Sequence, residues 1–215
     1  MMQRSVLGWE AGMRKWMLFA VLMCSASLAR ADALAQLQAF IGDVQAAQGH
    51  FTQVVHAEDG SQAAPQEGDF AFQRPGRFRW EVKRPYEQLV LSDGEVLLQY
   101  DPDLEQMTRR RVDEAIGASP AAILFGSGKL DDNFVLTPRP ARGGLEWLRA
   151  TPRQTDAGFE SLDIGLRDNL PVVLEVRDGF GQMTRIELED LRTAGQLDDS
   201  LFTFVPPAGT DVVVM

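Results

Sequence analysis

Cysteine, histidine and basic residues are scarce in this sequence of 215 residues. It contains one cysteine and two histidines, and 21 Lys and Arg residues stand against 31 Asp and Glu residues, for a formal net charge of -10. A single cysteine excludes an internal disulfide framework and a cysteine-rich zinc site. The acidic balance argues against a nucleic-acid backbone or an anionic membrane surface as the main partner, because both attract basic patches.

The sequence also lacks an apolar run long enough to cross a membrane at its start. The basic pair Arg14–Lys15 precedes a short apolar run, Trp16–Ser25, and then Ala29–Ala31. This order is typical of a secretory signal peptide, and the apolar run is shorter than the ~20 residues that span a bilayer. We therefore expect residues 1–31 to be a signal peptide cleaved after Ala31, and residues 32–215 to form a single domain. The segment removed holds the only cysteine.

Helical periodicity is present in one segment near the start of the expected mature chain. Asp32 is a suitable N-cap, and apolar residues follow at spacings of three and four residues. These residues are Leu34, Leu37, Ile41 and Val44. The pattern predicts a helix from Asp32 to Gln48 that ends at Gly49 and packs its apolar stripe on a larger element.

Most of the remaining sequence alternates between apolar and polar residues. The clearest case is Arg77–Lys83, in which Phe78, Trp80 and Val82 share one face. Asp93-Gly94 is a strong hairpin signal. About ten strands are predicted, at His50–His56, Asp69–Gln73, Arg77–Lys83, Gln88–Ser92, Glu95–Tyr100, Asn133–Thr137, Leu145–Ala150, Phe159–Leu166, Val172–Arg177 and Gln182–Leu191. Two further short strand segments, Phe202–Val205 and Val212–Val214, end the chain. A short helix is predicted at Ser119–Phe125. The spacing favours a curved antiparallel sheet or barrel with a few helices packed on it.

Residue patterns of known catalytic and metal sites are incomplete in this sequence. His50 and His56 are too far apart on one predicted strand to bind one metal, at roughly 20 Å. The acidic run at 101–105 contains Pro102 and lacks the glycine of a calcium loop. The segment 126–129 lacks the first glycine and the Ser/Thr of a phosphate loop, and no G-x-S-x-G occurs. We expect no catalytic residues, no metal and no cofactor.

Aromatic residues are concentrated on two neighbouring predicted strands. Phe70, Phe72, Phe78 and Trp80 lie within eleven residues. Their alternation places them on strand faces, where they either form a plain hydrophobic core or line an apolar cavity. Composition alone leaves both interpretations open.

The same region resembles a known family. The run 70–81, continued by Pro85, Ser92-Asp93-Gly94 and 100–106, is similar to the periplasmic outer-membrane lipoprotein carrier family, LolA. Weaker matches lie at 51–53, 119–120, 133–138 and 202–207. The resemblance implies an α+β, mainly β fold: an unclosed, strongly curved antiparallel half-barrel with about three helices that form a lid over an apolar cavity.

The resemblance also implies roles for individual residues. Arg74 matches an arginine that bonds lid groups and holds the empty cavity closed. The side chains expected to line the cavity or form the lid are Phe70, Phe72, Phe78, Trp80, Ile41 on the first helix and Leu124 on the central helix.

Function follows from the resemblance as well. It implies a soluble periplasmic carrier, not an enzyme, that binds the acyl chains of lipoproteins bound for the outer membrane. An inner-membrane ABC transporter complex would release these lipoproteins to the carrier, and the outer-membrane receptor LolB would accept them. One-to-one transfer suggests a monomer. The alternative is a periplasmic regulatory protein that senses lipids or lipoproteins with the same half-barrel fold.

Overall fold

The computed structural model describes residues 32–112, 133–153 and 158–215. The elements are α2 (Ala33–Asp43), β1 (Ala46–His56), β2 (Gln66–Gln73), β3 (Arg77–Arg84), β4 (Gln88–Asp93), β5 (Val96–Asp101), β6 (Gln106–Arg111), β7 (Phe134–Arg142), β8 (Leu145–Pro152), β9 (Ser161–Arg167), β10 (Leu170–Arg177), β11 (Met183–Ala194), the 3-10 helix η2 (Asp199–Phe202) and β12 (Asp211–Val214). The predicted signal peptide at 1–31 and the predicted helix at Ser119–Phe125 lie outside the described residues.

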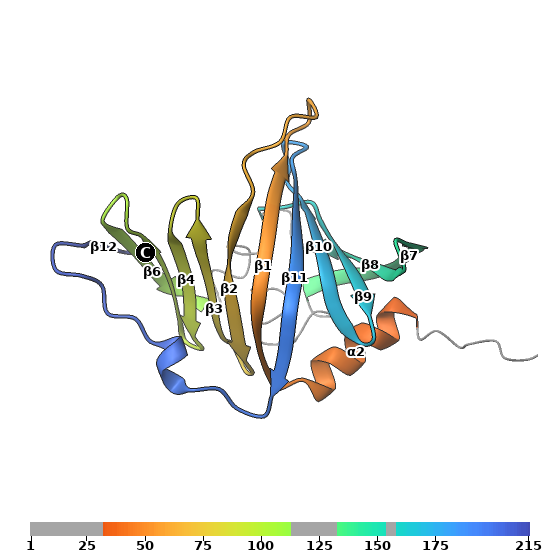
Figure 1. Ribbon diagram of the computed structural model, residues 1–215, viewed down its shortest axis with the longest axis horizontal. Helices are drawn as coiled ribbons and strands as arrows, with labels where there is room; N and C mark the ends of the chain where they lie inside the picture. The colour runs from red at the N-terminus through yellow and green to blue at the C-terminus, as the bar shows by residue number, and fades with distance from the viewer. Residues whose placement is uncertain (1–31, 113–132, 154–157) are drawn as a thin grey trace, which may run out of the picture. The chain divides into compact units, whose positions relative to one another are not determined.

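Twelve strands form one sheet in the order β12-β6-β5-β4-β3-β2-β1-β11-β10-β9-β8-β7. Adjacent strands of the sheet are consecutive in sequence, except in the pairs β1–β11 and β12–β6. Within the described part of the chain β12 and β7 are the two ends of the sheet, which is therefore unclosed. The strands turn progressively, so that β8 runs at a steep angle to β1 (Figure 1). A mainly β fold with an unclosed, curved sheet was predicted from the sequence and is confirmed.

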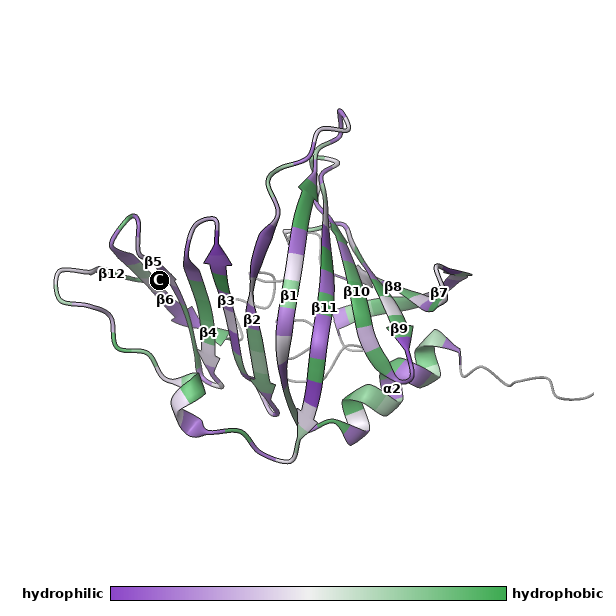
Figure 2. Ribbon diagram, in the orientation of Figure 1, coloured by the Kyte–Doolittle hydropathy of each residue, from purple (hydrophilic) through white to green (hydrophobic). Residues whose placement is uncertain are grey.

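The two faces of the sheet differ because strand side chains alternate in direction. Bands of apolar and polar residues along the strands show this alternation (Figure 2). We call the face on which α2 packs the inner face, and the opposite one the outer face. The inner face and α2 form the main hydrophobic core, whose largest fully buried side chains include Phe40, Phe51, Phe72, Leu148 and Ile164.

The first helix begins as predicted but ends earlier. Asp32 is its N-cap, and its carboxylate accepts a hydrogen bond of 2.8 Å from the Ala35 amide. The prediction that the helix continues to Gln48 is wrong, because it ends at Asp43. The segment 46–48 pairs with β11 on one side and with β2 on the other. Pairing on both sides satisfies the backbone groups of these residues and outweighs the helix propensity of Ala-Ala-Gln.

Gly49 does not end the helix but lies within β1, at a shift in register. A Cβ atom there would lie 2.7 Å from the Glu189 carbonyl oxygen and 2.9 Å from the Phe70 ring. Only glycine allows β11 and the Phe70 ring to approach this closely.

Two other predictions need correction. The predicted strand Phe202–Val205 is wrong, because Phe202 is the last residue of η2 and residues 203–205 form no strand. Asp198 caps η2, and its carboxylate accepts a hydrogen bond of 2.8 Å from the Ser200 amide. Strand β6 was not predicted, and β12 pairs with it in parallel, so the sheet is not wholly antiparallel. The described residues contain one α-helix. The expectation of about three helices stays a prediction, because the central helix predicted at Ser119–Phe125 lies outside these residues. The other predicted strands are present, with somewhat different ends.

Candidate functional site

Five aromatic side chains form a continuous surface on the inner face, which we call the aromatic wall. Register places Phe70 opposite Trp80 and Phe72 opposite Phe78 on β2 and β3. The fifth member, Phe51 of β1, stacks on Trp80 with ring centroids 3.7 Å apart. The sequence pattern predicted the shared face for the two strands. It did not identify Phe51, because that contact depends on the pairing of β1 with β2.

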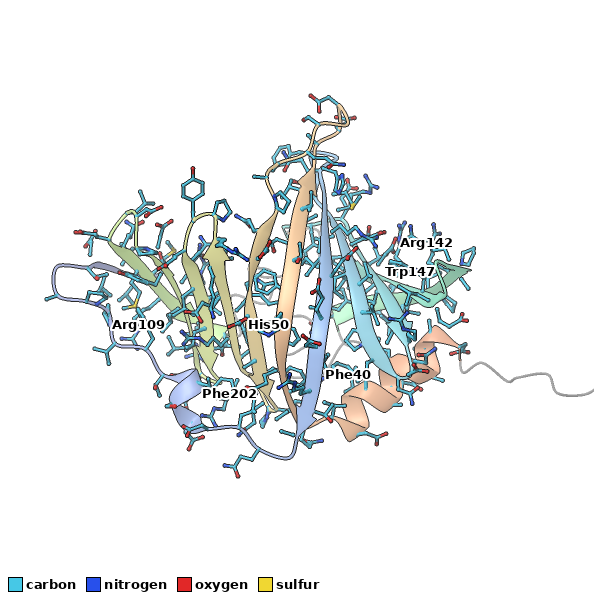
Figure 3. All side chains as sticks on the ribbon, viewed as in Figure 1. Phe40, His50, Arg109, Arg142, Trp147 and Phe202 are labelled. Atoms are coloured by element: carbon cyan, nitrogen blue, oxygen red, sulfur yellow. The ribbon has the colours of Figure 1, made fainter. Side chains whose placement is uncertain are left out.

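Helix α2 covers one end of the aromatic wall. Phe40 lies between the helix and the sheet (Figure 3) and meets Phe72 edge to face, with centroids 5.9 Å apart. Ile41, a predicted lid residue, is half-buried and packs against the same core. The other predicted lid residue, Leu124, lies outside the described residues. Among the predicted lid positions, the described structure therefore brings Ile41 to the core.

Arg74, just after β2, connects the end of α2 with the sheet. Its Nε donates a hydrogen bond of 3.1 Å to the carbonyl oxygen of Val44, the C-cap of α2. Its guanidinium carbon lies 5.4 Å from the ring centroid of Phe40 and 5.2 Å from that of Phe72. Burial lowers the pKa of the Arg74 guanidinium from its ordinary value. The side chain thus contacts the helix end and two aromatic rings of the core at once.

The aromatic wall is closely packed in this structure. Phe70, Phe72, Phe78 and Trp80 are at most 6% exposed. A pocket of about 320 Å³ lies on the outer face beside His50, Asp69 and Arg79. An apolar cavity over the wall stays a prediction. The ring contact between α2 and the wall is that of Phe40 with Phe72.

Charged residues line the outer face opposite the wall. The Asp69 carboxylate lies 2.5 Å from Nδ1 of His50 and also accepts a hydrogen bond from Nζ of Lys83. Within the described residues, no group of three His, Cys, Asp or Glu side chains could hold a metal ion. None of the helices among the described residues has the length and apolar character to cross a membrane. The outer face thus carries ion pairs between exposed groups.

The Asp69 cluster makes stability depend on pH. Burial alone would raise the pKa of the Asp69 carboxyl, but hydrogen bonds and charge from Lys83 and His50 outweigh burial and lower it. A carboxyl with a lowered pKa stabilises the fold above its unfolded pKa and loses that contribution as pH falls through the folded value. We expect wild type to exceed Asp69→Asn in urea midpoint at pH 7, and the difference to shrink below about pH 3.8. Asp103→Asn, in an exposed turn, is the control, and a pH-independent difference for Asp69→Asn would contradict the assignment.

Comparisons with known proteins point to one family. The family model described as "Outer membrane lipoprotein carrier protein LolA" matches residues 42–205. A protein named "Outer-membrane lipoprotein carrier protein" from Bordetella avium is 53% identical over 197 residues, which cover 91% of this chain and 94% of that protein. Its namesake from Bordetella pertussis is 52% identical over 198 residues, with 92% and 94% covered.

A solved structure shares the fold. It is an uncharacterized conserved protein from Thermus thermophilus, with a TM-score of 0.51 and 12% sequence identity. The match covers 85% of this chain and 96% of the solved chain. At this identity the likeness concerns the fold alone.

Proposed function

This chain belongs to the family of outer-membrane lipoprotein carrier proteins, LolA, and from that premise we propose that it carries lipoproteins by binding their acyl chains. The observation that supports the proposal most directly is the match of the family model to residues 42–205, which include all five residues of the aromatic wall. In the proposal, acyl chains lie along this wall when its covering helix moves. The carrier itself makes and breaks no bond.

A carrier must bind its cargo reversibly. Each buried methylene contributes about 0.8 kcal/mol, so complete burial of several acyl chains would prevent release. The cost of opening a lid offsets part of this binding energy. We propose that α2 is part of the lid, with Ile41 on it, and that Arg74 holds the lid shut through Val44, Phe40 and Phe72. Leu124 keeps its proposed lid role from the family resemblance.

The family also suggests a route for the cargo. In our proposal the chain is exported to the periplasm by residues 1–31, cleaved after Ala31, and works there as a monomer in which 32–215 form one domain. It accepts lipoproteins from an inner-membrane ABC transporter complex and delivers them to the outer-membrane receptor LolB. Both transfers move the same lipid-modified protein between binding sites, so no cofactor is required.

Purification from the periplasm followed by mass spectrometry tests the carrier function. We expect intact lipoprotein, with all its acyl chains, to purify with the wild-type protein in about equimolar amounts. Trp80→Leu, in the aromatic wall, should carry at most a few per cent of the wild-type amount. Trp147→Leu is the matched control, because Trp147 is a buried tryptophan on the outer face, beneath the Arg142 guanidinium (Figure 3). Thermal unfolding checks that both variants fold.

The outcomes separate the alternatives. A stoichiometric regulatory protein without lipid would contradict the carrier function in favour of a sensor, and hydrolysed lipid would contradict it in favour of an enzyme. Equal loss of lipoprotein from both folded tryptophan variants would contradict the assignment of the cargo to the inner face.

A further inference from the structure

Two glutamine side chains interrupt the apolar inner face at one end of the aromatic wall. Gln53 of β1 and Gln66 of β2 are direct cross-strand partners, and Nε2 of Gln53 donates a hydrogen bond to Oε1 of Gln66. The next inner-face pair along the same strands is Phe51 opposite Gly68. Because side chains alternate, both amides point to the same face as the aromatic wall. They lie at the opposite end from Arg74, which follows the other end of β2.

The amide pair is unlike its surroundings. On β1, β2 and β3, the inner-face positions between this amide pair and Arg74 hold aromatic, aliphatic or glycine residues. Each glutamine is half-buried. A primary amide has two N–H donors and a carbonyl with two lone pairs, so one mutual hydrogen bond leaves further donors and acceptors on both side chains. These groups are hydrated where water reaches them, and any apolar ligand that expelled the water would leave them unsatisfied at a cost.

Each acyl chain of the proposed cargo has its polar carbonyl group at one end only. The acylated end of a lipoprotein joins long hydrocarbon chains to carbonyl groups of acyl linkages, which accept hydrogen bonds. Along β2, the distance from Gln66 to Phe72 is six residues, or about 20 Å. One leaflet of acyl chains is about 15 Å thick, half the hydrocarbon core of a bilayer. A chain of that length whose carbonyl lies at Gln66 therefore ends before Phe72, within the length of the wall.

Resting on the proposed carrier function, we infer that the Gln53–Gln66 amide pair binds the acyl-linkage carbonyls of the cargo and sets how far its chains enter. The glutamine N–H groups donate to these carbonyls, and the hydrocarbon below them contacts the aromatic wall. The pair would then select acylated ligands over hydrocarbon chains that lack carbonyls. It would also fix the depth at which the acyl chains bind. The protein part of the lipoprotein would then lie outside the sheet, past the ends of β1 and β2 that carry Gln53 and Gln66.

A comparison of two synthetic lipopeptides tests the inference. One carries two ester-linked chains on its cysteine, and the other carries ether-linked chains of the same length, which lack the carbonyls. Two neutral hydrogen bonds give wild type an expected preference of about thirtyfold for the ester. The double variant Gln53→Met/Gln66→Met keeps the side-chain length and should bind both lipopeptides equally. Gln99→Met, a half-buried inner-face glutamine of β5, should keep the wild-type preference.

The possible results test the role of the amide pair and the carrier function separately. Equal binding of ester and ether by wild type, or a retained preference in the folded double variant, would overturn the role of the amide pair while leaving the carrier function in place. Failure of wild type to bind either lipopeptide would overturn the carrier function, and with it the inference. Urea unfolding of the variants establishes that binding is compared between folded proteins.

Discussion

Phe72→Ala is expected to lower the free energy of unfolding by about 3–5 kcal/mol, the usual cost of truncating a buried phenylalanine. Phe72 is fully buried and meets Phe40 of α2 and the Arg74 guanidinium, so its loss leaves a cavity between the helix and the sheet. Domains of this kind are stable by about 5–15 kcal/mol in total. The substitution should therefore remove a large share of the stability, measured by urea unfolding monitored by circular dichroism.

Phe180→Ala is the matched control for this measurement. Phe180 lies in the turn between β10 and β11 and is 86% exposed. Its truncation removes little buried surface, and we expect a change within about 0.5 kcal/mol. If Phe72→Ala lowered the free energy of unfolding no more than Phe180→Ala, this would contradict the packing of α2 on the aromatic wall through Phe72.

Arg74→Leu is expected to have the largest effect on delivery. Leucine retains apolar bulk beside Phe40 and Phe72 but loses the hydrogen bond to Val44 and the charge over both rings. Contributions of about 1 kcal/mol from each kind of contact would shift the balance between closed and open lid about thirtyfold. We expect the variant to fold, to retain lipoprotein more strongly, and to transfer it to the receptor at least tenfold more slowly in detergent-free buffer.

The chain contains its own control for this experiment. Arg84 also precedes a proline, but it lies at the other end of β3, is exposed, and forms an ion pair with Glu67. Arg84→Leu should transfer lipoprotein at the wild-type rate, since exposed ion pairs contribute little. Wild-type transfer by Arg74→Leu would contradict the gate, whereas slow transfer by both variants would point to a general effect of arginine loss.

Alternation predicted which residues lie on the inner face, but it could not predict which residues of different strands contact one another. The run Arg77–Lys83 places Phe78 and Trp80 on one face in any register, and the structure has them there. The stacking of Phe51 on Trp80 depends on two strand registers at once. The contact of Arg74 with Val44 joins residues 30 positions apart and required the position of the helix end. Local pattern indicated which residues face inward, while pairing decided which of them touch.

The wrong boundaries have a similar cause. Ala46-Ala47-Gln48 has good helix propensity, yet it pairs with two strands, because tertiary pairing outweighs weak local preference. Strand β6 contains a single apolar residue, Met107, which Thr108 and three arginines follow, so its alternation is difficult to recognise. At Phe202 the aromatic alternation favoured a strand. The Phe202 side chain is instead buried beneath Arg77, whose guanidinium carbon lies 4.6 Å from the centroid of the Phe202 ring. The 3-10 helix η2 positions the ring there.

The unclosed order of the sheet exposes the chain to edge-to-edge aggregation, which a closed barrel avoids. An unpaired strand edge recruits strands of other molecules unless proline, charge or shortness prevents it. At one end, β7 contains Pro138 and Pro140, which have no N–H to donate, and Arg139 and Arg142. At the other end, β12 covers β6 with only four residues. The two ends of the described sheet thus resist self-association by different means, although the sheet is not closed into a barrel.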